Sequence, residues 1–169
     1  MVMSTGAIPL KTTRRKRLKM IQRIQTLYLL LAVAVVVACL CLPVGTVEPA
    51  GMGVSAVLYN LGLYGANGLA ACPVLFADLV VLAALSLVTV FLYRRRALQM
   101  KLCVAGVALC LVWYVYYAYC AFVSLSVGGA VFHVRFAACL PFVALVLLLM
   151  ARRGVKADDR LVRSMDRIR

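Results

Sequence analysis

Residues 26–45 read TLYLLLAVAVVVACLCLPVG, a run that holds no charged residue and ends near Pro43 and Gly45. A helix that crosses the roughly 30 Å of bilayer hydrocarbon needs about 20 mostly apolar residues. The run meets this requirement and therefore predicts a membrane-spanning helix. Because it begins late and is as long as a span, we interpret it as a signal anchor rather than a cleaved signal peptide.

Three further apolar segments follow, so that the predicted spans are about 26–45, 73–93, 102–124 and 133–151. Hydrophobic residues make up 66% of the 169 residues and charged residues 14%, whereas about a quarter of a soluble domain is charged. The expected fold is all-α, an integral membrane bundle of four antiparallel transmembrane helices. Pro141 is expected to kink the fourth helix.

The 19 Lys and Arg residues gather at the ends of these segments. They precede the first span, occupy the 94–101 turn and fill the 152–169 tail, with Arg135 as the one exception. The positive-inside rule assigns the basic side to the cytoplasm. We therefore expect a multi-pass membrane protein with both termini cytoplasmic and in contact with anionic lipid headgroups. Charges placed in this way indicate topology and not nucleic-acid binding.

The segments outside the spans leave two alternatives open. Residues 1–19 are basic and lack a structural pattern, so either Met20 is the true start, or 11–19 is a polybasic segment that binds anionic lipid. The membrane domain then covers 20–169. The outer loop, 46–72, is rich in glycine, and its stretch VSAVLYNLGLYG predicts a small hairpin or an interfacial flap.

The cytoplasmic tail, 152–169, ends in an amphipathic pattern. Its apolar residues recur at helical spacing: Leu161, Val162, Met165 and Ile168. This pattern predicts a short cytoplasmic amphipathic C-terminal helix over 157–169. Such a helix lies on the membrane surface or docks on the 94–101 turn, where it also offers a surface to a protein partner. The alternative is a helix that frays in the cytosol.

Three stretches carry a resemblance to a known family: MIQRIQTLYLLLA at 20–32, RRALQMKLC at 95–103 and DDRLVRSMDRIR at 158–169. They resemble the signatures of a bacterial domain-of-unknown-function family of short four-span inner-membrane proteins, which open with MIQRIQT and close with a segment like DEALVRSADRLR. The resemblance covers 20–169 and implies four helices with cytoplasmic ends, but no activity, substrate or catalytic residue. The outer loop is shorter and richer in glycine than the family pattern.

These three stretches all fall on the side with the basic residues, so we expect them to form a cytoplasmic cap. Its candidate residues are Gln22, Arg23, Gln25, Arg96, Gln99, Lys101, Arg163, Asp166 and Arg167. The cap is either a docking surface for a partner or internal packing combined with contact to lipid headgroups.

A second candidate site lies toward the outer face. Asp78 is the one acid inside a predicted span, and intramembrane acids are functional candidates by default. Tyr117, His133 and Arg135 are expected at comparable depth, so these four residues form a candidate polar cluster that binds a small ligand or relays a proton. The alternative is an Asp78–Arg135 ion pair that holds two helices together, with the tyrosines in an interfacial belt.

Other chemistry finds little support in the sequence. The seven cysteines include no C-x-x-C pair, so they pack between helices, or Cys72 forms a disulfide with Cys41, Cys120 or Cys139. No cluster of metal ligands, phosphate-binding loop or paired carboxylates is visible. We therefore expect no cofactor and a non-enzymatic structural or interaction role, the alternative being a small transporter or ligand sensor that uses Asp78.

Overall fold

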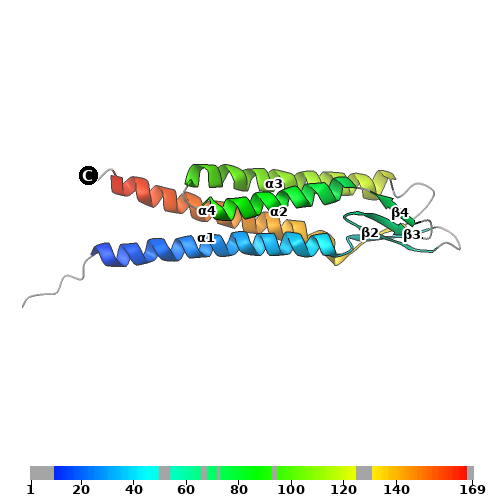
Figure 1. The fold of residues 1–169 in the computed structure, drawn as a ribbon, viewed down its shortest axis with the longest axis horizontal. Helices are drawn as coiled ribbons and strands as arrows, with labels where there is room; N and C mark the ends of the chain where they lie inside the picture. The colour runs from blue at the N-terminus through cyan, green and yellow to red at the C-terminus, as the bar shows by residue number, and fades with distance from the viewer. Residues whose placement is uncertain are drawn as a thin grey trace, which may run out of the picture.

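The computed structural model describes residues 10–49, 54–65, 68–71, 73–92, 95–124 and 131–166, with side chains at 24–49, 54–65, 73–92, 95, 97–122 and 131–157. Four helices run along the long axis, and a small sheet lies at one end (Figure 1). The helices are α1 (Leu10–Cys41), α2 (Pro73–Phe91), α3 (Arg96–Tyr119) and α4 (Leu140–Asp166). A short π-helix, η1 (Cys120–Ser124), continues α3, and a 3-10 turn, η2 (Phe136–Cys139), leads into α4.

Each helix contains a stretch long and apolar enough to cross a membrane: Ile24–Cys41, Pro73–Phe91, Ala97–Phe122 and Phe136–Ala157. In α2 the buried residues recur every three or four positions and so share one face, which carries Leu75, Leu79, Leu82, Ser86 and Thr89. The opposite face is apolar as well, because Val81 and Val88 are about half exposed. A helix that is apolar on all sides is typical of a membrane span.

Each helix packs against two neighbours, in the order α1–α2–α3–α4 and back to α1. Gly106 of α3 lies where three helices meet, since a Cβ at this position would be 3.0 Å from Leu148 Cδ1 of α4 and 3.5 Å from Leu82 Cδ1 of α2. At Gly154 of α4, a Cβ would be 2.8 Å from Gln25 Cγ of α1. Both glycines therefore allow a close approach between helices.

The sheet is antiparallel, with the strand order β4-β3-β2-β1-β5. Its strands are β1 (Gly45–Glu48), β2 (Ala56–Tyr59), β3 (Gly62–Gly65), β4 (Gly68–Ala71) and β5 (Val131–Val134). The pairing of Tyr59 with Gly62 closes a hairpin with a two-residue turn. The hairpin predicted within VSAVLYNLGLYG is confirmed.

The predicted all-α class is correct for the bundle and wrong for the segments that form the sheet. Short strands rich in β-branched and aromatic residues, such as VFHV at 131–134, replace the expected start of the fourth span. His133 consequently lies in β5, and Arg135 follows in an extended conformation (φ −95°, ψ 158°). The apolar helical stretch begins only at Phe136.

Two helices differ in extent from the prediction. α1 begins at Leu10, inside a segment expected to lack structure, and it ends at Cys41, before the predicted limit of 45. α4 continues without a break to Asp166, so the tail is the end of α4 and not a separate helix. Both extensions are rich in good helix formers and contain no proline. Pro141 lies in the first turn of α4, where its missing N–H removes no helical hydrogen bond.

The extra length of α1 and α4 appears at one end of the molecule. There the two helices reach beyond the ends of α2 and α3, on the side opposite the sheet (Figure 1). α1 and α4 pack against each other, with Gln25 of α1 against Gly154 of α4, and their ends extend beyond this contact (Figure 1).

Candidate functional site

The turn between β2 and β3 inserts a polar side chain into the sheet end of the bundle. Asn60 is fully buried, and its Nδ2 donates a hydrogen bond of 2.6 Å to the carbonyl oxygen of Cys39 in α1. In a regular helix the N–H of residue 43 would donate to this carbonyl, but residue 43 is a proline. The Asn60 amide therefore supplies a donor that the helix lacks.

The other half of the same amide joins the sheet to α3. Asn60 Oδ1 accepts a hydrogen bond of 3.3 Å from Nε1 of Trp113, which is also fully buried. The thiol of Cys39 contacts the carbonyl oxygen of Ala137 in η2 at 3.6 Å, a distance that suits a weak sulfur hydrogen bond. Asn60, Cys39 and Trp113 are named the amide plug below, because together they fill the interior where bundle and sheet meet.

Aromatic residues of α3 extend the amide plug toward the sheet. Trp113 and Tyr117 stack with ring centroids 4.9 Å apart, and Phe132 of β5 lies edge-on to Tyr117 at 5.9 Å. The Tyr117 hydroxyl donates to the carbonyl oxygen of Val44 at 2.8 Å, and the Tyr114 hydroxyl donates to that of Ala138 at 2.7 Å. The tyrosine hydroxyls thus satisfy backbone carbonyls where helices turn into strands.

Two of the four residues of the predicted polar cluster, Tyr117 and His133, have partners outside the cluster. Tyr117 donates to Val44, and His133 lies 3.5 Å from the carboxylate of Glu48, with both side chains more than half exposed. Arg135 is exposed at the sheet end. Among the described residues no ion pair joins Asp78 to Arg135, so the helix-bridging alternative is not observed either.

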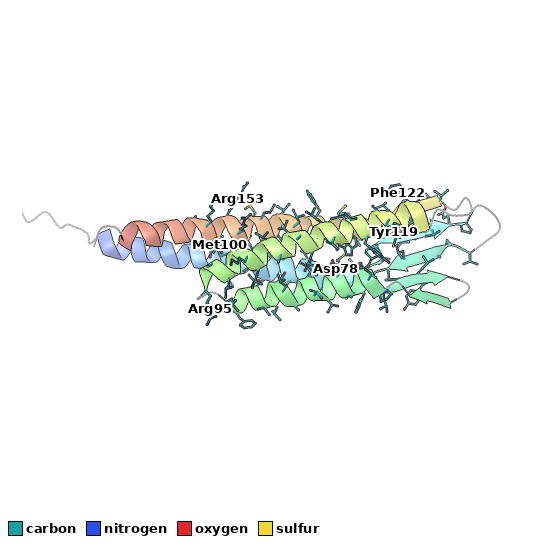
Figure 2. All side chains as sticks on the ribbon, turned by 90° about the horizontal axis from the view of Figure 1, so that it is seen from above. Asp78, Arg95, Met100, Tyr119, Phe122 and Arg153 are labelled. Carbon is teal, nitrogen blue, oxygen red and sulfur yellow. The ribbon has the colours of Figure 1, made fainter. Side chains whose placement is uncertain are left out.

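Asp78 is placed on α2 toward the sheet end of the bundle (Figure 2). Its residue as a whole is half-buried, yet Oδ2 is buried and lacks a hydrogen-bond partner in the described part of the chain. An unpaired carboxylate oxygen in apolar surroundings is costly. Of the four predicted cluster residues, Asp78 is therefore the one with a buried oxygen for which the described residues provide no partner.

The cytoplasmic cap is described only in part. Gln25 and Gln99 are buried, and Gln25 packs against Gly154, whereas Lys101 is exposed. The two glutamines thus belong to the packing of the bundle rather than to an exposed surface. Side chains of the remaining predicted cap residues lie outside the described set: Gln22, Arg23, Arg96, Arg163, Asp166 and Arg167.

The described cysteines form no disulfide with one another, and Cys39, Cys103 and Cys110 are buried in the bundle. Packing therefore accounts for these three. Cys72, which the disulfide alternative requires, lies outside the described residues.

The sequence did not single out the amide plug. Asn60 is a polar residue in a turn, and such residues usually face water, so its pattern gives no sign of burial. Trp113 did offer a signal, because it is the one tryptophan of the chain and lies well inside a span, where its N–H requires a partner.

These features define a four-helix protein with membrane-type helices and a small sheet at one end. The chain belongs to the family described as a domain of unknown function (DUF4293), which matches residues 21–168. This match confirms the resemblance seen in the sequence. Searches of curated proteins and of solved structures find no match to the chain.

Replacing the amide of the plug tests its structural role. Asn60→Leu leaves the Cys39 carbonyl and the Trp113 N–H buried without their partner, at about 1–3 kcal/mol for each group. We expect a lower unfolding temperature in detergent micelles and a red-shifted emission from Trp113. The control Leu61→Asn makes the reverse substitution at the exposed neighbouring position. It should change the unfolding temperature and the Trp113 emission little. Equal stability of the two variants would contradict the assigned role.

Proposed function

We propose that the protein is a multi-pass protein of the bacterial inner membrane with a non-enzymatic structural or interaction role. Apolar side chains exposed on the outside of all four helices support a lipid environment: Leu30, Val81, Leu111, Val112 and Val146 are each about half exposed or nearly so. The buried polar groups of Asn60 and Trp113 have partners within the protein, as a medium without water requires.

The distribution of charge supports an orientation with both termini in the cytoplasm. The end opposite the sheet presents exposed cations from two helices and a turn: Arg95, Lys101, Arg152, Arg153 and Lys156. The sheet end exposes the pair of Glu48 and His133 together with Arg135. The positive-inside rule then assigns the sheet to the outer side.

A filled interior supports a structural or interaction role over transport. The amide plug and Tyr117 occupy the centre of the bundle at the sheet end, and all four side chains are buried. A solute moving along the bundle axis would have to displace their hydrogen bonds and stacked rings. In this proposal the bundle holds the sheet rigidly at the outer surface, while the paired ends of α1 and α4 offer a surface to a protein partner in the cytoplasm.

The orientation can be tested by labelling engineered thiols. In a chain with Cys41, Cys72 and Cys139 changed to serine, we compare Glu48→Cys with Lys156→Cys, both at exposed positions. A membrane-impermeant maleimide should label position 48 in intact spheroplasts and position 156 only after permeabilisation. The opposite pattern would overturn the orientation, and labelling of both positions in intact cells would overturn the four-span topology.

The interaction role predicts a partner that depends on the end of α4. Truncation before Asp158 and the double variant Arg163→Glu with Arg167→Glu should both remove the proteins that crosslink to the full chain in cells. Glu48→Gln, at the opposite end, should retain them. If the same proteins remain bound to the truncated chain, the tail contributes to packing and topology, and the partner surface lies elsewhere.

The orphaned Oδ2 of Asp78 favours a second candidate, a small transporter or ligand sensor. Asp78→Asn removes the charge and keeps the shape of the side chain. A ligand-coupled role predicts that the variant folds with unchanged thermal stability and loses the phenotype that the intact protein restores to a deletion strain. Full restoration by Asp78→Asn would rule this candidate out.

A further inference from the structure

The exposed face of α4, near the end opposite the sheet, carries a groove of about 390 Å³, a size within the range of ligand pockets. Its described lining residues follow the helix: Val146, Leu149, Met150, Arg152, Arg153 and Lys156. The first three are apolar and lie within the membrane-type stretch, and the last three are cationic and lie near its end. The groove is therefore apolar along one half and positively charged along the other.

This division matches the two parts of an anionic phospholipid. A phosphate oxygen accepts strong, charge-assisted hydrogen bonds from guanidinium and ammonium groups. An acyl chain gains dispersion contacts from apolar side chains at the depth of Val146 and Leu149. The order along α4 is also the order of depth in a bilayer, with the cations at the headgroup level. Arg152, Arg153 and Lys156 are all exposed, so their side chains are open to a ligand from the lipid phase.

We propose that this groove binds one anionic diacyl phospholipid, with its phosphate at Arg152, Arg153 and Lys156 and one acyl chain along Val146, Leu149 and Met150. The inference rests on the proposed membrane location. It goes beyond a general attraction to anionic headgroups, because it assigns a defined site with both a charged and an apolar part. The second acyl chain lies against the exposed apolar surface of the bundle.

The chain offers a matched control for the charged part of the site. Arg95 and Arg153 are both exposed arginines at the end opposite the sheet, and Figure 2 shows them on different sides of the bundle. Replacing either by glutamine removes the same charge from the same end. A diffuse electrostatic attraction responds equally to both changes, whereas a site on α4 responds to Arg153→Gln alone.

The test is native mass spectrometry of the full chain in detergent micelles, titrated with phosphatidylglycerol or with phosphatidylcholine of the same acyl chains. We expect one retained phosphatidylglycerol per chain and a preference over phosphatidylcholine. Arg153→Gln should weaken retention about fivefold, as expected for one basic residue near an anionic lipid, and Arg95→Gln should leave it unchanged. Equal losses in the two variants would overturn the site.

Two further arms test the apolar part. Val146→Trp should fill the groove and reduce retention, whereas Val112→Trp, at another lipid-facing position on α3, should not. Glycerol phosphate, which lacks acyl chains, should not compete with the lipid. Competition by glycerol phosphate would make the site one for free phosphate compounds and overturn the lipid assignment. Because binding in micelles does not depend on orientation in cells, this test can fail independently of the thiol-labelling test.

Discussion

Hydrogen bonds of the Asn60 side chain to Cys39 of α1 and Trp113 of α3 join the sheet to the bundle in a place that is closed to solvent. Pro43 ends α1 and leaves the Cys39 carbonyl without its usual donor, and the β2–β3 turn returns the amide that replaces it. The same amide accepts a hydrogen bond from Trp113, which connects α3 to α1 and to the β2–β3 turn. Since each unpaired group would remain buried, this side chain contributes to the arrangement of α1, α3 and the sheet together with the Tyr117–Val44 hydrogen bond.

The two ends of the bundle are held together by different means. At the sheet end, the Asn60 amide and two tyrosine hydroxyls donate to backbone carbonyls, the Trp113 indole donates to the Asn60 side chain, and stacked rings lie beside them. At the opposite end, Gly154 lets α4 approach α1 closely enough for Gln25 to be buried. Hydrogen bonds specify one geometry, whereas glycine contacts permit close packing over a range of small displacements.

The length of continuous apolar runs predicted the four helices, because a span of about 20 residues produces a strong signal. Of the sheet, only the β2–β3 hairpin was predicted, since strands of four residues are too short to establish a period, and VFHV directly precedes an apolar helix. The ends of α1 and α4 were missed for another reason: a polar segment that forms a helix against a neighbour resembles a polar segment without structure. Among candidate site residues, the acid and the basic clusters stood out by charge, while Asn60 could be recognised only once its turn was placed inside the bundle.

The helices of the bundle differ in the length of their apolar stretches. That of α2 has 19 residues, and that of α3 together with the first residues of η1 has 26. At about 1.5 Å per residue, the stretch in α2 is roughly 28 Å long, slightly less than the roughly 30 Å of a typical hydrocarbon core. A helix whose apolar stretch is no longer than the hydrocarbon core is thick does not need to tilt to keep that stretch inside the core. A thicker bilayer would have to thin around it. Because α3 packs against α2, the shorter helix limits the inclination of the longer one. In the proposed membrane location, the short apolar stretch of α2 therefore suits a thin bilayer better than a thick one.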